Sequence, residues 1–202
     1  MTDAEDRHKA KMAKRKAAQD AEVASKPILE KGLLLVHTGP GKGKSTAAFG
    51  LALRALGRGK KVGVVQFIKG AWTTGERFAF ERFGDAIEWR TMGEGFTWET
   101  QDKERDIAAA RAGWEKAKDL IRDETLRLVL LDEINIALRY GYLDLGEVLT
   151  FLREEKPPMT HVVLTGRNAA PELVEAADLV TEMTQVKHPF RAGIKAQPGV
   201  EF

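Results

Sequence analysis

The 202-residue sequence contains no cysteine. The chain therefore cannot form a disulfide, bind zinc or an iron–sulfur cluster through thiolates, or attack a substrate with a thiol. It also lacks any apolar run of about 18 residues, the length of a membrane span, and its first residues are polar, unlike a secretory signal. Neither sign of charge dominates, since 32 basic and 30 acidic residues leave a net charge of +2. These absences predict a cytoplasmic protein that binds neither a membrane nor nucleic acid.

The first 26 residues have few large apolar side chains. They hold seven alanines, seven Lys or Arg and five Asp or Glu, a composition that favours a helix but offers little surface to dock it. Two interpretations stay open: a frayed, solvated tail, or an arm that orders over a ligand or a neighbouring subunit. Pro27 separates this segment from the rest. We therefore expect a helical or flexible charged arm over residues 1–30 and one folded domain over residues 31–202.

Short apolar runs alternate with helical patterns from Lys31 onward. Runs that are apolar almost throughout are typical of parallel strands buried on both faces. The alternation predicts a three-layer α/β fold with a mostly parallel central sheet, whose carboxyl edge binds ligands. The predicted strands are Leu33–His37, Val62–Ile68, Ile87–Thr91, Leu126–Leu131, His161–Thr165 and Leu179–Glu182, and the predicted helices are Lys44–Leu56, Gly75–Phe83, Gln101–Asp123, Leu145–Arg153 and Pro171–Ala176.

A glycine-rich loop joins the first predicted strand to the first predicted helix. Glycines in such a loop let backbone N–H groups converge on phosphate oxygens, and the helix that follows adds the positive end of its dipole. Lys44 would reach the outer phosphates, and the Ser45 hydroxyl would bind Mg²⁺. The context predicts a P-loop NTPase-like fold that binds a nucleoside triphosphate through Thr38, Gly39, Gly41, Lys42, Gly43, Lys44, Ser45 and Thr46.

The start of this loop departs from the common P-loop spacing. That spacing, G-x-x-x-x-G-K-[ST], requires glycine at position 38, where this chain has Thr38. We therefore expect the beginning of the loop to differ from that of ordinary P-loop ATPases.

Two acidic residues, Asp132 and Glu133, follow the buried strand Leu126–Leu131. Carboxylates at the end of a strand beside a P-loop are placed to hold Mg²⁺, directly or through water. One of them could instead cap a helix, and Asp132 is the candidate for that role. Glu133 is then the predicted metal ligand, together with Ser45.

Other polar residues follow predicted strands at the same edge. Gln66, Lys69, Arg167 and His188 could contact a ligand there or could be structural. His37 and His161 are expected to be hydrogen-bonded strand residues, and Trp114 a packing residue of its helix. Phe96 and Trp98 lie in a glycine-flanked loop, where they could form an apolar wall for a flat ligand or could anchor the loop in the core.

The ordered motifs of the folded part resemble one family. From about Lys31 to Phe202 the sequence resembles the corrinoid adenosyltransferases of the CobA/CobO/BtuR type. The matching blocks are Gly39–Thr46, Val64–Gly70, Gly95–Gln101, Val129–Glu133, Leu164–Arg167, Val186–His188 and Ala192–Gln197. The family's loop also has its first glycine at the position of Gly39, so the resemblance accounts for Thr38.

The resemblance implies a reaction and a set of partners. The 5′-deoxyadenosyl group of ATP would pass to Co(I) of a corrinoid, such as cobalamin, cobinamide or an a,c-diamide, with release of triphosphate. Lys44 would act in catalysis with Mg²⁺, and the nucleotide would lie reversed in the loop. Phe96 and Trp98 would cover the lower corrin face and keep cobalt four-coordinate, which eases its reduction. A reduced flavin or flavoprotein would supply the electron, and the protein would be a homodimer whose arm can cover the corrinoid.

Two other functions fit the loop without the resemblance. A small-molecule kinase would use the same loop to transfer the γ-phosphoryl group and release ADP. An ATP-switched binding module would use its arm on nucleic acid, although seven basic against five acidic residues make a poor electrostatic footprint.

Overall fold

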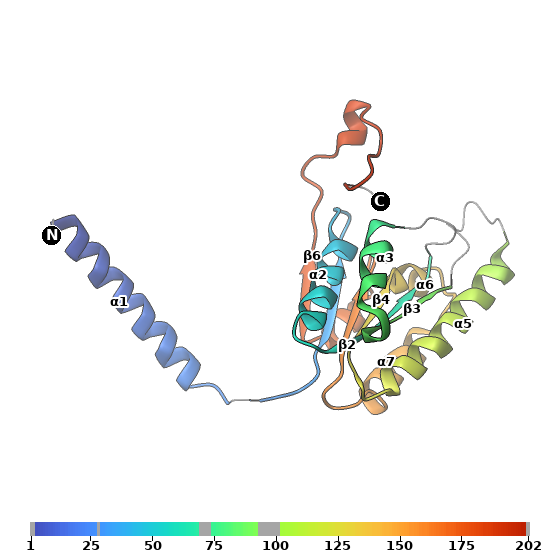
Figure 1. Cartoon of the computed structure of the whole chain (residues 1–202), viewed down its shortest axis with the longest axis horizontal. Coiled ribbons are helices and arrows are strands. Elements are labelled where there is room, and N and C mark those ends of the chain that lie inside the picture. Colours follow the sequence, from blue (N-terminus) through green and yellow to red (C-terminus); the bar gives the residue numbers. More distant parts are fainter. Residues whose placement is uncertain (1–2, 28, 69–73, 93–101, 201–202) are drawn as a thin grey trace. The chain divides into compact units, whose positions relative to one another are not determined.

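The computed structural model describes residues 3–27, 29–68, 74–92 and 102–200 (Figure 1). The chain forms two units, Met1–Glu30 and Lys31–Phe202. The first unit contains helix α1 (Asp3–Ala24), in which residues 4–24 are all exposed. Residues 3–24 of the predicted helical or flexible arm thus form a helix. Its only large apolar residues, Met12 and Val23, are themselves exposed, so α1 buries no core of its own.

The second unit is built on a six-stranded sheet in the order β3-β2-β4-β5-β1-β6. Among the described residues every strand pair is parallel. The sheet that we predicted as mostly parallel is entirely so in that part of the chain, and its strands end at one carboxyl edge. The strands are β1 (Leu34–Thr38), β2 (Lys61–Gln66), β3 (Ile87–Thr91), β4 (Leu126–Asp132), β5 (His161–Thr165) and β6 (Leu179–Glu182).

Helices cover both faces of the sheet (Figure 1). Adjacent residues of β4 show the two layers, because Leu130 packs with Phe49 of α2 on one face and Leu131 packs with Trp114 of α5 on the other. Trp114 is buried and meets Phe151 edge-on, with ring centroids 5.3 Å apart, as expected for a packing residue. The three-layer α/β prediction is confirmed. The helices are α2 (Lys44–Leu56), α3 (Gly75–Phe80), α5 (Lys103–Arg122), α6 (Ile134–Arg139), α7 (Leu145–Glu154) and α8 (Pro171–Ala176), with 3₁₀ turns η1 (Glu81–Ala86) and η2 (Pro189–Ala192).

Three helical segments differ from the prediction. The helix predicted to reach Phe83 stops at Phe80 and continues as η1, where Gly84 takes a φ of 52°. Helix α5 begins after Asp102, because the Asp102 carboxylate accepts the backbone N–H of Arg105 at 3.1 Å and caps the helix. Helix α6 was not predicted, since its six residues directly continue an apolar strand.

His161, at the amino end of β5, forms a hydrogen bond with the residue before β1. Its Nδ1 accepts the backbone N–H of Leu33 at 3.0 Å, so the ring is neutral with its proton on Nε2. Burial lowers the pKa of His161 below its usual 6.5, and the nearby cations of Arg127 and Lys156 lower it further. His161 is therefore a hydrogen-bonded strand histidine, as predicted.

Acid should weaken this contact. Because the pKa of His161 is lower in the folded than in the unfolded chain, its contribution is complete above pH 6.5 and is lost as pH falls through the folded value. His161→Asn offers a side-chain oxygen that does not titrate, so it should lose less stability than the wild type on acidification. Urea unfolding midpoints at about pH 7.5 and about pH 5.5 measure the difference. Equal losses in both proteins would contradict the role of His161.

Candidate functional site

The loop between β1 and α2 turns at Gly39 rather than at Thr38. Thr38 still belongs to the strand, where its carbonyl accepts the N–H of Met183 at 2.9 Å and its hydroxyl accepts the N–H of Ala169 at 3.0 Å. Gly39 then takes a φ of 97°, which a side chain would strain. A threonine is thus tolerated where the common spacing has glycine, because the left-handed turn falls one residue later.

The chain that leaves β6 packs against the back of this loop. The Gly41 N–H donates to the Met183 carbonyl at 2.7 Å. A Cβ on Gly41 would lie 2.5 Å from the Thr184 carbonyl oxygen, and one on Gly39 would lie 2.5 Å from that of Met183. Gly43, which precedes α2 with a φ of 106°, has no such neighbour within 4 Å. The loop therefore packs closely against the chain that leaves β6 at Gly39 and Gly41, whereas Gly43 has open space beside it.

Lys44 lies within the loop at the first position of α2. It is buried, and its Nζ donates to the Gly41 carbonyl at 2.5 Å. Burial lowers the pKa of Lys44, and the Glu133 carboxylate opposes that shift. The positive charges of Arg167 and Lys42 lower the Lys44 pKa further. The structure therefore brings four predicted site residues close enough for their charges to interact.

Glu133 follows β4 in an unusual backbone conformation. Its φ is 62° and its ψ 18°, the left-handed region that residues other than glycine rarely adopt. The Glu133 N–H donates to the Thr165 hydroxyl at 2.9 Å. Glu133, not Asp132, occupies the N-cap position of α6, so the alternative helix-cap role for Asp132 is wrong. Strain of this kind persists where surrounding contacts hold it, and it concentrates at functional sites.

The oxygen atoms at this edge suit Mg²⁺. Ser45 and Glu133 are both half-buried, and they offer a hydroxyl and a carboxylate oxygen, the hard ligands that Mg²⁺ prefers. Among residues 3–27, 29–68, 74–92 and 102–200, no three His, Asp or Glu side chains gather closely enough to hold a metal ion alone. Such a donor set fits an ion that also binds substrate phosphates and water.

The remaining predicted residues have different surroundings. Gln66 is buried, and its amide nitrogen donates to Asp132 at 3.1 Å. Lys42, Thr46 and Arg167 are exposed. His188 accepts the N–H of Phe190 at 3.2 Å within its own segment. Lys69, Phe96 and Trp98 lie outside the described residues.

Three further residues form hydrogen bonds next to the site. One is His37, and the other two were not indicated by the sequence. His37 is buried, and its Nδ1 donates to the Lys44 carbonyl at 3.2 Å, a structural role of the kind that we predicted. Thr165 and Asn135 were not predicted. Asn135 is buried and donates from Nδ2 to the Gly166 carbonyl at 3.0 Å. Thr165 lies in the block Leu164–Arg167, so the sequence indicated the motif, but within it only Arg167 was given a candidate role.

Two family models match the chain. ATP:corrinoid adenosyltransferase BtuR/CobO/CobP matches residues 30–202, and cob(I)alamin adenosyltransferase N terminal matches residues 1–23. The chain belongs to the ATP:corrinoid adenosyltransferase family. The resemblance noted from the motifs is thereby confirmed, and neither the kinase nor the ATP-switched module is favoured. As a member of this family the protein is a transferase whose substrates are ATP and a corrinoid.

Named relatives agree with this assignment over almost the whole chain. Corrinoid adenosyltransferase from Sinorhizobium sp is 64% identical over 97% of this chain and 92% of its own length. The corrinoid adenosyltransferase from Pseudomonas aeruginosa is 57% identical over 97% and 96% of the two chains. That from Escherichia coli K12 is 47% identical over 98% and 99%.

Solved structures support the fold of this adenosyltransferase. Flagellar accessory protein FlaH from Methanocaldococcus jannaschii is 12% identical and superposes with a TM-score of 0.51, over 76% of this chain and 72% of that one. At such low identity the likeness concerns the fold alone, and it agrees with the predicted P-loop NTPase-like class. Within the described part of the chain, no helix combines the length and apolar character that crossing a membrane requires.

Proposed function

We propose that this adenosyltransferase binds ATP in the loop of residues 38–46 and joins its C5′ atom to cobalt. Cobalt(I) of the corrinoid substrate supplies an electron pair to C5′, and the Co–C bond forms. The C5′–O bond breaks with its electron pair leaving on triphosphate, while cobalt becomes formally cobalt(III). Because the corrinoid is the nucleophile, the chain needs neither a nucleophilic side chain nor a general base.

The buried ammonium of Lys44 carries this proposal. It lies in a glycine loop at the start of α2, where loop N–H groups and the helix dipole favour an anion. These groups and Lys44 would stabilise the negative charge that develops on triphosphate as the C5′–O bond breaks, and such charge stabilisation is a large contribution to catalysis. The nucleotide would lie reversed relative to ordinary P-loop enzymes, in keeping with the turn at Gly39.

Ser45 and Glu133 would hold Mg²⁺ beside the triphosphate. Bound there, Mg²⁺ would neutralise phosphate charge as a Lewis acid. The Glu133 carboxylate also raises the pKa of Lys44, against the lowering that burial, Arg167 and Lys42 cause. Arg167, whose positive charge lowers the pKa of Lys44, would also lie near the triphosphate. The ligand contacts predicted for Gln66 and His188 stay predictions, since the described contacts of both are internal.

The residues that would contact the corrinoid are inferred from the family resemblance. We propose that Phe96 and Trp98 cover the lower corrin face and that Lys69 contacts one of the substrates. A reduced flavin or flavoprotein as electron donor, a homodimer and a cytoplasmic location also stay predictions. So do the two roles of the charged arm, as a solvated tail or as a cover for the corrinoid.

Product analysis tests the proposed reaction. The protein, MgATP and a chemically reduced cobalt(I) corrinoid are mixed in the dark, and the cobalt spectrum and phosphate products are recorded. We expect a light-sensitive alkyl-cobalt spectrum and free triphosphate in equal amounts. Appearance of ADP without alkylation would instead indicate γ-phosphoryl transfer and overturn the proposal. Pre-reduced cobalt removes the dependence on an electron donor, so failure to find the natural donor cannot affect the result.

A further inference from the structure

A row of hydrogen-bonded side chains crosses the carboxyl edge of the sheet. It follows the strand order β3-β2-β4-β5, and the register places Gln66 beside both Thr91 and Asp132. Gln66 Oε1 accepts the indole N–H of Trp89 at 3.1 Å, and Gln66 Nε2 donates to Asp132 Oδ2 at 3.1 Å. Asp132 Oδ1 accepts the hydroxyl of Thr165 at 2.8 Å. The row then ends at the Glu133 N–H, which donates to the same Thr165 hydroxyl.

The direction of every hydrogen bond in this row is fixed from its two ends. An indole N–H can only donate, so the amide oxygen of Gln66 must face Trp89 and its nitrogen must face Asp132. A backbone N–H can also only donate, so the Thr165 oxygen must accept from Glu133. The Thr165 proton is then directed to Asp132, whose carboxylate accepts on both oxygens. Asp132 is fully buried, and a buried carboxylate requires such partners.

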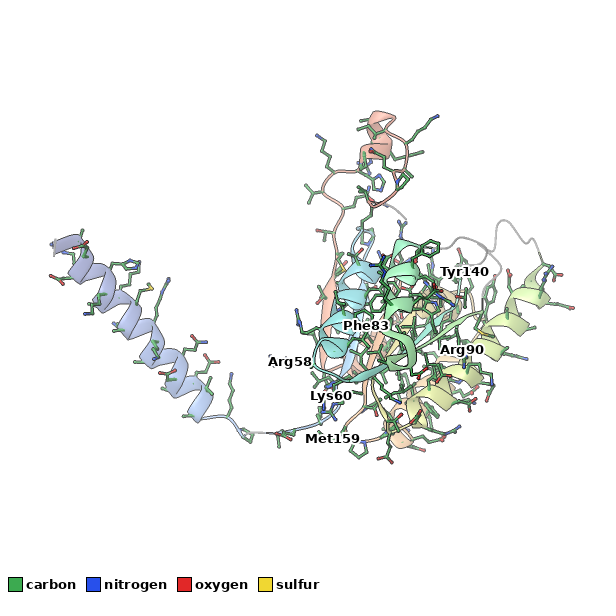
Figure 2. All side chains as sticks on the ribbon, viewed as in Figure 1. Arg58, Lys60, Phe83, Arg90, Tyr140 and Met159 are labelled. Carbon is green, nitrogen blue, oxygen red and sulfur yellow. The ribbon has the colours of Figure 1, made fainter. Side chains whose placement is uncertain are left out.

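The Trp89 end of the row is anchored in the core. The Trp89 ring stacks on Phe49 with centroids 5.3 Å apart and planes 4° apart, and it also packs against Phe80 at 5.9 Å. Phe83, labelled in Figure 2, extends this aromatic group by packing on Phe80 at 6.1 Å. The indole N–H of Trp89 is thus held in one direction by packing, and the orientation of Gln66 follows from it.

The other end of the row lies on a strained residue. Glu133 has a φ of 62°, and the Thr165 hydroxyl holds its N–H in that conformation. Gly166, next to Thr165, leaves room for the side chains of Asn135 and Glu133, because a Cβ there would lie 2.9 Å from Asn135 Cβ and 3.2 Å from Glu133 Oε2. Thr165, the last residue of β5, therefore contacts the strained backbone of Glu133, and Gly166 contributes to the space for its carboxylate.

We propose that Thr165 is a positioning residue that directs the Glu133 carboxylate toward the divalent cation, and that the row from Trp89 through Asp132 holds Thr165 in place. This inference rests on the proposed metal-binding role of Glu133. Thr165 itself touches neither nucleotide nor metal in this scheme, and it acts through the Glu133 N–H. Outer partners of this kind commonly change metal affinity about 10-fold to 100-fold when removed.

Calorimetric titration with ATP, without corrinoid, tests the inference without turnover. The ratio of the ATP dissociation constants in EDTA and in excess Mg²⁺ measures what the metal adds to binding. Thr165→Val, which keeps the shape and loses the hydroxyl, should reduce that ratio about 10-fold or more, with little change in EDTA. Thr165→Ser restores a hydroxyl and should restore the ratio. A general structural defect would instead weaken ATP binding equally with and without Mg²⁺ and would overturn the proposal.

Glu133→Gln tests the metal-binding role of Glu133 separately from the positioning role of Thr165. It should lose the contribution of Mg²⁺ while binding metal-free ATP at least as tightly, because a negative charge near the triphosphate is removed. An altered ratio in Glu133→Gln with a wild-type ratio in Thr165→Val would overturn the inference alone. A wild-type ratio in Glu133→Gln would overturn its metal-binding role, and the inference with it. If Thr165→Val does not fold, Thr165→Ala applies the same comparison against Thr165→Ser.

Discussion

Lys44→Ala should lower the rate of adenosyl transfer about 100-fold to 1,000-fold, the usual loss when one group that stabilises developing charge is removed. In this protein the effect follows from burial. Lys44 is 6% exposed, so its charge acts on triphosphate with little screening by water. Single-turnover formation of alkyl-cobalt from a pre-reduced corrinoid and saturating MgATP measures the change. A rate within a few-fold of the wild type would contradict the catalytic role of Lys44.

Lys60→Ala is the control for loss of a lysine charge. Lys60, labelled in Figure 2, lies in the turn between α2 and β2, where its backbone N–H donates to the Ala55 carbonyl. This turn leads into the amino end of β2, and the proposed site lies at the carboxyl ends of the strands. The variant removes the same formal charge and should leave the rate unchanged. A comparable loss in both variants would indicate that overall charge, not the position of Lys44, governs the reaction.

Stability measurements test whether a slow Lys44→Ala variant is slow because it is less stably folded. Because burial lowers the pKa of Lys44, its charged form is less favourable in the folded chain than in the unfolded chain. Removing it should therefore not lower the thermal midpoint substantially, although the hydrogen bond to Gly41 is lost. A functional residue that is held at some cost in stability is a common feature of active sites.

The fold could be predicted from the sequence because its signals are local. Strands such as His161–Thr165 are nearly continuous apolar runs, and burial on both faces of a parallel sheet requires that pattern. The glycines at 39, 41 and 43 and the Lys-Ser pair at the start of α2 likewise lie close together in the sequence, so the glycine-rich loop between β1 and α2 could be predicted without tertiary information. Short elements such as α6 carry too few residues for a period to be recognised.

The supporting part of the site could not be predicted, since it joins residues that are distant in sequence. Gln66 and Asp132 are 66 positions apart, and Asp132 and Thr165 are 33 apart. Their contact depends on the strand order and the register, which a single sequence does not determine. Glu133 was predicted as a ligand from its position after β4. Its left-handed conformation and its hydrogen bond to Thr165 became evident only from the structure.

Gly41→Ala should lower kcat/KM for ATP about 100-fold, the scale of loss when a site is displaced by roughly 1 Å. The φ of Gly41 is not positive, so backbone strain does not contribute. The effect comes from contact, because the new Cβ would lie 2.5 Å from the Thr184 carbonyl oxygen and 2.7 Å from that of Met183. Both neighbours are backbone atoms, which cannot rotate away as a side chain could. The loop must therefore move away from the chain that leaves β6.

Gly50→Ala provides the matched control within α2. A Cβ on Gly50 meets no atom within 4 Å, and alanine in a helix interior is favoured over glycine by about 1 kcal/mol. This variant should keep its activity and gain stability, whereas Gly41→Ala should lose about 1–3 kcal/mol through overpacking. Thermal unfolding and steady-state kinetics on both proteins separate the two effects. Wild-type activity in Gly41→Ala would mean that the loop is free to move off Met183 and Thr184, and that its phosphate-binding geometry does not depend on the segment that follows β6.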